Sequence, residues 1–123
     1  MSHSPGFVHI VEQIKPQITE VTLEQLNQLI STNTPHHLID VREDHEWDKG
    51  YIDGAIHLSK GIIERDIEKT ITDKSATIVL YCGGGFRSAL AADNLQKMGY
   101  SNILSLAGGY RGYKAQKGAM DNE

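Results

Sequence analysis

The feature that most restricts the fold is the stretch from residue 78 to residue 98. Residues 78–81 are apolar, Cys82 follows, and then come three glycines, an aromatic residue, an arginine and a serine. From Ser88 onward, apolar residues recur at spacings of three and four positions, as on one face of a helix. This stretch predicts a buried strand, a tight loop and a helix, with Cys82 where the strand meets the loop.

The rest of the chain alternates in the same way. We expect four more strands, at residues 17–21, 37–41, 55–58 and 102–106, and helices at residues 6–14, 23–32, 44–49 and 60–70 and after residue 109. Such alternation predicts an α/β fold, with a parallel sheet covered by helices on both faces. A length of 123 residues suits one domain and is too short for two. We expect a single domain over residues 1–123, in which residues 1–16 form a helical extension.

Composition narrows the range of possible functions. The net charge of −4 argues against a general binder of nucleic acid or anionic membranes. No apolar stretch approaches the roughly 18 residues of a membrane span, and the first residues lack the pattern of a signal peptide. The single cysteine excludes an internal disulfide and fits a reducing compartment, so we expect a cytoplasmic protein. The histidines have no metal-ligand spacing, so we expect no metal site.

The residues after Cys82 predict a site for an anion. Consecutive glycines allow backbone N–H groups to converge on one point, and the helix that follows adds its free N–H groups there. Arg87 adds a permanent cation with a planar fork of donors. A lone cysteine is more often a small buried apolar residue, but these neighbours favour a thiolate nucleophile. Cys82 and Arg87 are therefore the candidate catalytic residues.

Two nucleotide-binding motifs do not fit the glycine loop. A dinucleotide fingerprint needs an acidic residue about 20 positions further on, and residues 103–107 contain none. A phosphate loop of nucleoside triphosphatases needs Gly-Lys-Ser/Thr, which does not follow here.

At these residues the sequence resembles the rhodanese family of sulfurtransferases. Cys-Gly-Gly-Gly-Phe-Arg-Ser at residues 82–88 is similar to the family's active-site loop. Asp-Val-Arg at residues 40–42 and the run at residues 46–56 are similar to its upstream signature, and the pair at residues 108–109 to its Gly-Gly motif. The resemblance covers roughly residues 18–118, with Tyr51 in place of the usual histidine and Tyr113 in place of tryptophan.

The resemblance implies a five-stranded sheet in the order 3-2-4-5-1 and a persulfide on Cys82. It implies a sulfurtransferase that moves sulfane sulfur from thiosulfate or a persulfide donor to a thiol or cyanide, without a cofactor. The partners would be these small molecules and a sulfur-relay protein. The substrate-binding residues would be those of the loop: Gly83, Gly84, Gly85, Phe86 and Ser88.

Two alternatives remain open from the sequence. Cysteine phosphatases and arsenate reductases of related architecture have five residues between cysteine and arginine, whereas four separate Cys82 from Arg87, and the loop contains no general acid. Some rhodanese-like domains serve only as binding or regulatory modules. In that case Phe7, Val8 and Val11 of the first helix would be the partner surface. We expect a monomer or a weak homodimer.

Overall fold

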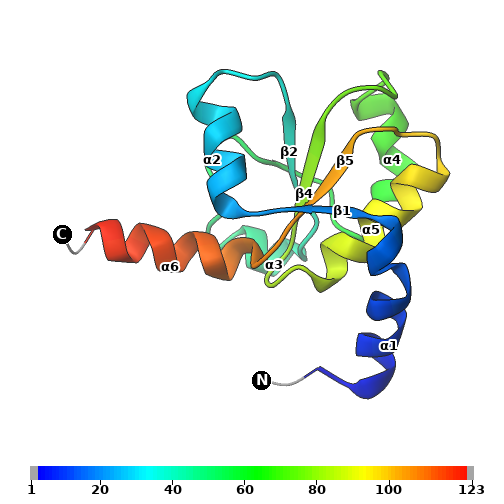
Figure 1. Ribbon diagram of the computed structural model, residues 1–123, viewed down its shortest axis with the longest axis horizontal. Coiled ribbons are helices and arrows are strands. Elements are labelled where there is room, and N and C mark those ends of the chain that lie inside the picture. The colour runs from blue at the N-terminus through cyan, green and yellow to red at the C-terminus, as the bar shows by residue number, and fades with distance from the viewer. Residues whose placement is uncertain (1–2, 122–123) are drawn as a thin grey trace.

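Five parallel strands form one sheet in the order β1-β5-β4-β2-β3, which is the predicted order read from the opposite edge. The structure is a computed structural model that describes residues 3–121, with side chains to residue 118 (Figure 1). The strands are β1 (Thr19–Val21), β2 (His37–Asp40), β3 (Ile56–His57), β4 (Ile78–Tyr81) and β5 (Ile103–Leu106). The helices are α1 (Pro5–Ile14), η1 (Lys15–Gln17), α2 (Leu23–Ser31), α3 (Asp44–Trp47), α4 (Ile63–Thr70), α5 (Phe86–Lys97) and α6 (Gly109–Asp121).

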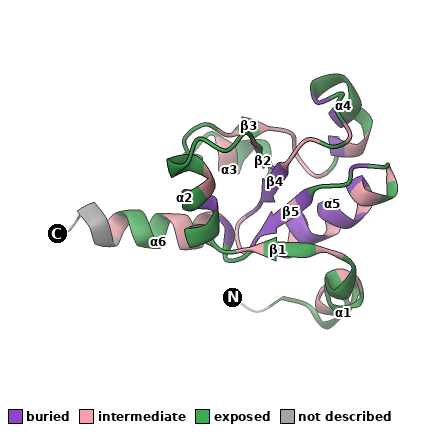
Figure 2. Ribbon diagram, turned by 45° about the horizontal axis from the view of Figure 1, so that its top comes forward, coloured by how far each residue is buried: buried purple, intermediate pink, exposed green. Residues whose placement is uncertain are grey.

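Strand β4 is the centre of the sheet, and all four of its residues are buried. Because side chains alternate along a strand, Ile78 and Leu80 join Cys82 in a core shared with α4 and α5. Val79 and Tyr81 point the other way, into a core shared with α2 and α6. Figure 2 shows the buried residues concentrated in β4, β5 and α5. Cys82 therefore directly follows the strand whose residues are all buried, β4.

Local signals in the sequence account for most element ends. Thr22 and Gln25 form a capping box at the start of α2, with hydrogen bonds of 2.8 and 3.1 Å. Helix α5 begins at Phe86, two residues earlier than predicted, because Gly85 takes a left-handed conformation (φ 110°) and caps it. Helix α4 begins at Ile63, three residues later than predicted. The Lys60 N–H donates to the Val41 carbonyl at 2.9 Å, so residues 60–62 form a turn instead.

The first helix lies against the domain. Helix α1 packs on α5, and Val11 is 1% exposed, whereas the neighbouring residue on the solvent side, Ile10, is 46% exposed. Phe7 and Val8 are only partly covered. The prediction of Val11 as part of a partner surface is therefore wrong, because Val11 is buried against the domain, where it contributes to stability.

A pair of substitutions measures that contribution. Val11→Ala should lower the free energy of unfolding by about 2 kcal/mol, because it removes buried methyl groups and leaves a cavity. Ile10→Ala on the exposed side should cost about 0.5 kcal/mol or less. Urea unfolding of both variants checks this prediction. Equal losses would show that α1 is not anchored through Val11.

Candidate active site

The loop that follows β4 holds the sulfur of Cys82 by backbone groups. Cys82 is 1% exposed, and its Sγ accepts hydrogen bonds from the N–H groups of Gly85 at 3.1 Å and Ser88 at 3.4 Å. Gly85 reaches this position through its left-handed conformation, which a residue with a side chain adopts only at a cost. The glycine run therefore bends the backbone around the sulfur.

Further N–H groups of the loop have no protein acceptor. Within residues 3–121, those of Gly83, Gly84, Phe86 and Arg87 donate to no protein atom. Phe86 and Arg87 open α5, where the first N–H groups of a helix lack intrahelical partners. These donors add positive potential to the segment that surrounds the sulfur. The segment can therefore stabilise an anion.

The start of α6, which follows the adjacent strand β5, supports the Cys82 loop through backbone hydrogen bonds. The N–H of Tyr110 donates to the Cys82 carbonyl at 2.8 Å, and that of Arg111 donates to the Gly83 carbonyl at 3.1 Å. Gly109 makes this approach possible, because a Cβ atom there would lie 2.9 Å from the carbonyl carbon and oxygen of Gly83. The Gly-Gly pair that the sequence singled out thus allows α6 to approach the Cys82 loop closely.

Arg87 binds a carboxylate from another part of the chain. Its Nη1 and Nη2 donate to Oε1 and Oε2 of Glu46 on α3 at 2.7 and 3.1 Å. This pairing lowers the pKa of Glu46 to about 2 and raises the pKa of Arg87, to which the nearby thiol of Cys82 also contributes. Part of the arginine's charge is therefore balanced by Glu46, a partner that sequence reasoning did not identify, although the upstream signature contains it.

Two hydroxyl groups lie behind the sulfur. The Oγ of Ser88 is 3.6 Å from Sγ and 2.8 Å from the Oγ of Ser105 on β5, and both serines are fully buried. A hydroxyl at this position can accept from a thiol or donate to a thiolate. Sequence reasoning included Ser88 and missed Ser105, whose only signal was one polar residue in the apolar strand β5.

A buried ion pair between Asp40 and Arg42 braces the neighbouring loop. Arg42 donates to the Asp40 carboxylate at 2.7–3.1 Å and to the Gly50 carbonyl at 2.7 Å. Its guanidinium also lies 4.1 Å from the centre of the Tyr110 ring. These contacts connect the loop after β2 with the start of α6, on which the Cys82 loop depends.

The ring of Phe86 lies against the N-terminal segment. It stacks on the ring of His3, with centroids 4.3 Å apart, and meets the ring of Phe7 edge-on at 5.4 Å. Phe86 is partly buried as a result. Of the predicted loop residues, the structure gathers Gly85 and Ser88 on the sulfur and directs the Phe86 ring toward α1.

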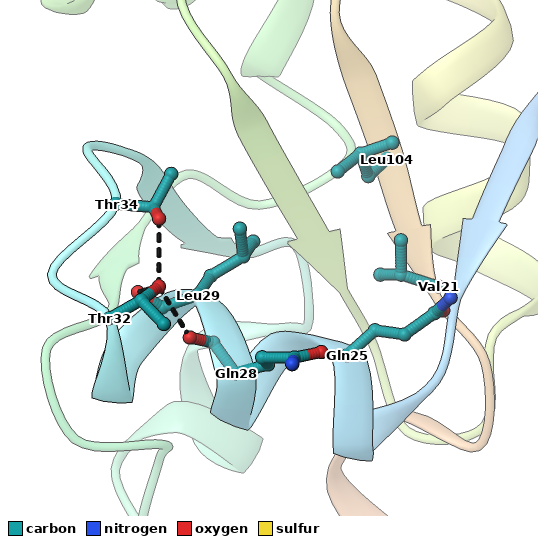
Figure 3. Close-up of a pocket in the computed structure, with 7 residues that line it drawn as sticks. All are labelled: Val21, Gln25, Gln28, Leu29, Thr32, Thr34 and Leu104. Atoms are coloured by element: carbon teal, nitrogen blue, oxygen red, sulfur yellow. Dashed lines mark hydrogen bonds between the residues drawn. The ribbon is translucent and has the colours of Figure 1, made fainter.

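A separate hollow of about 440 Å³ lies beside α2 (Figure 3). Its walls come from α2, the turn after it and the neighbouring strands β1 and β5: Val21, Gln25, Gln28, Leu29, Thr32, Thr34 and Leu104. None of these residues belongs to the Cys82 loop. Several of the polar groups are already engaged, because Gln25 caps α2 and the Thr32 hydroxyl donates to the Gln28 carbonyl at 2.7 Å. This hollow contributes nothing to the chemistry at Cys82.

The described part of the chain gives no support for a metal centre or a membrane span. Among residues 3–121 there is no group of three histidine, cysteine or acidic side chains placed to hold a metal ion. Within the same residues, no helix combines the length and apolar character needed to cross a membrane.

The ion pair of Glu46 predicts a pH effect on stability. The folded-state pKa of about 2 lies below the ordinary value of 4.5, so folding favours the ionised carboxylate. The stabilisation is present in full above about pH 5 and disappears as the pH falls toward about 2. Glu46→Gln should be less stable than the wild type near pH 7, and the difference should shrink near pH 3. Urea unfolding at both pH values checks this, with Glu12→Gln on exposed α1 as the control.

The hydrogen bond between Ser88 and Ser105 predicts a loss of stability that does not depend on pH. Ser105→Ala removes a partner of the buried Ser88 hydroxyl and should lower the free energy of unfolding by about 1–3 kcal/mol. Ser101→Ala, at an exposed position just before β5, serves as the control and should change it by about 0.5 kcal/mol or less. Chemical denaturation of the three proteins decides the matter. A Ser105→Ala protein as stable as the control would mean that the Ser88 hydroxyl does not need Ser105.

Several known proteins are similar to this chain in sequence. Thiosulfate sulfurtransferase GlpE of Coxiella burnetii is 31% identical over 84 residues, which cover 68% of this chain and 77% of that protein. The putative sulfur carrier protein YrkF of Bacillus subtilis is 29% identical over 94 residues, 76% of this chain and 50% of YrkF. The probable adenylyltransferase/sulfurtransferase MoeZ of Mycobacterium tuberculosis is 36% identical over 89 residues, 72% of this chain and 23% of MoeZ. The chain thus spans half or less of the latter two relatives.

Solved structures share the fold. The human single-domain sulfurtransferase TSTD1 superposes with a TM-score of 0.69 at 23% identity, over 78% of this chain and 95% of its own. A Rhodopseudomonas palustris protein of unknown function, described as a possible tyrosine phosphatase, superposes with a TM-score of 0.84 at 24% identity, over 95% of both chains. The model of the rhodanese-like domain matches residues 22–116, which contain the whole Cys82 loop and the start of α6. The chain therefore belongs to the rhodanese-like domain family.

Proposed function

We propose that this protein is a sulfurtransferase that carries sulfane sulfur as a persulfide on Cys82. The observation that carries the proposal is the position of Sγ, which accepts hydrogen bonds from two backbone N–H groups. Four more N–H groups of the same segment have no protein acceptor. Such preorganised donors stabilise developing negative charge at low cost. Relatives named as thiosulfate sulfurtransferases support the same chemistry.

The reaction has two steps. The Cys82 thiolate attacks the outer sulfur of thiosulfate, a new S–S bond forms, and the old S–S bond breaks as sulfite leaves with the electron pair. An acceptor thiolate or cyanide then attacks the outer sulfur of the persulfide and takes it, which restores the Cys82 thiolate. In this scheme the loop donors and the Ser88 hydroxyl hold the sulfur, and Arg87 fixes the loop through Glu46.

The donor and acceptor in the cell are part of the proposal. Thiosulfate, a persulfide of a small thiol or a protein persulfide could each deliver sulfane sulfur to the loop. The names of YrkF and MoeZ, a putative sulfur carrier and a probable adenylyltransferase/sulfurtransferase, favour a sulfur-relay protein as one partner. A single reactive thiol suits a reducing compartment such as the cytoplasm.

Cys82→Ser tests the proposal directly. With thiosulfate, the wild-type protein should gain about 32 Da, the mass of one sulfur, and the serine variant should gain nothing, because a hydroxyl does not replace a thiolate nucleophile. Intact-protein mass spectrometry gives the answer, and far-UV circular dichroism verifies that the variant is folded. A serine variant that takes up sulfur at the wild-type rate would refute the proposal.

Phosphate-ester hydrolysis is the second candidate, because the similar Rhodopseudomonas palustris protein is described as a possible tyrosine phosphatase. Hydrolysis of this kind needs a general acid for the leaving alcohol. The carboxylate bound to the loop arginine is Glu46, whose pKa of about 2 leaves it ionised near neutral pH. We therefore expect negligible turnover of a chromogenic aryl phosphate. Turnover that Cys82→Ser abolishes would reverse this ranking.

A further inference from the structure

Arg111 is a second arginine that lies against the Cys82 loop, although it belongs to α6. It is the third residue of α6, and its N–H donates to the Gly83 carbonyl at 3.1 Å. Its side chain is exposed and extends along Gly84, where an added Cβ atom would lie 3.3 Å from Cζ and 3.6 Å from Nε. A guanidinium therefore covers the middle glycine of the loop, next to an N–H group without a protein acceptor.

Arg111 differs from the other two arginines around this loop in how its charge is paired. Arg87 is bound by both oxygens of Glu46, and Arg42 is buried with Asp40. Among the side chains of residues 3–118, no carboxylate pairs with Arg111. An unpaired cation at an exposed position keeps its hydrogen-bond donors available for a dissolved anion.

We propose that Arg111 forms an anion subsite at the mouth of the Cys82 loop. The subsite receives the oxyanion end of a negatively charged sulfur donor, such as the sulfonate oxygens of thiosulfate, while the outer sulfur faces Cys82. The planar fork of donors suits two oxygens of such a group. Arg111 takes no part in bond making, and the assignment of its ligand as a sulfur donor rests on the proposed function.

The subsite makes a prediction about selectivity. It raises the rate at which anions reach Cys82 relative to the rate for neutral reagents, because a fixed charge acts on the charge of the reagent. Arg87 is less suited to this task, since the Glu46 carboxylate takes one donor of each of its terminal nitrogens and balances its charge. The selectivity for anionic donors should therefore depend on α6 rather than on the arginine of the loop motif.

Alkylation of the single cysteine isolates this effect. Iodoacetate is anionic and iodoacetamide is neutral, so the ratio of their rate constants at Cys82 reports attraction of anions and cancels changes in thiol reactivity. Arg111→Gln should lower that ratio about fivefold at low salt, and Arg111→Lys should retain most of it. Lys114→Gln, which removes one exposed charge from the same helix, is the matched control and should leave the ratio unchanged. Added salt at about 0.5 M should bring the wild type close to Arg111→Gln.

Persulfide formation then identifies the ligand class. The second-order rate of the mass gain with thiosulfate should fall in Arg111→Gln in parallel with the alkylation ratio. An unchanged ratio, an equal fall in Lys114→Gln, or a thiol that reacts with neither reagent would overturn the subsite. A lowered ratio in a protein whose wild type never gains sulfur would refute the proposed function and keep the subsite as one for another anion.

Discussion

The loop that begins at Cys82 after β4 depends on one close backbone contact with the first turn of α6. The N–H groups of Tyr110 and Arg111 donate to the carbonyls of Cys82 and Gly83, while the N–H groups of Gly85 and Ser88 donate to the Cys82 sulfur. The contact needs Gly109, because any Cβ atom there would collide with the loop backbone. Two adjacent strands of the sheet thus deliver both sides of the site, as expected at the carboxyl edge of a parallel sheet.

The charges around the site have separate tasks. Arg42 is buried with Asp40 and holds two loops together, and Arg87 binds Glu46 and connects α3 to the loop. Both arginines are largely used for architecture, which is costly to disturb because removing one partner leaves a charge uncompensated. Arg111 has no such partner among the side chains of residues 3–118, and it is the arginine most available to a dissolved anion.

The N-terminal helix has two sides with different consequences. Val11 anchors α1 on α5, while His3 and Phe7 contact the ring of Phe86 in the active-site loop. The exposed residues of α1, Ile10 among them, are available to a partner.

The sequence alone determined the strand, loop and helix around Cys82, the alternation of elements, and Gly85 and Ser88 as loop residues next to the sulfur. These features are local, since they depend on hydrophobic spacing and on backbone conformations that few residues adopt. The sheet order came from resemblance to a family, because the pattern of a strand does not name its neighbour. The residues from elsewhere in the chain that contact the loop were identified only in the tertiary structure. Glu46 lies 41 positions from Arg87, Ser105 lies 17 positions from Ser88, and Arg111 lies 28 positions from Gly83; no spacing rule connects residues that far apart.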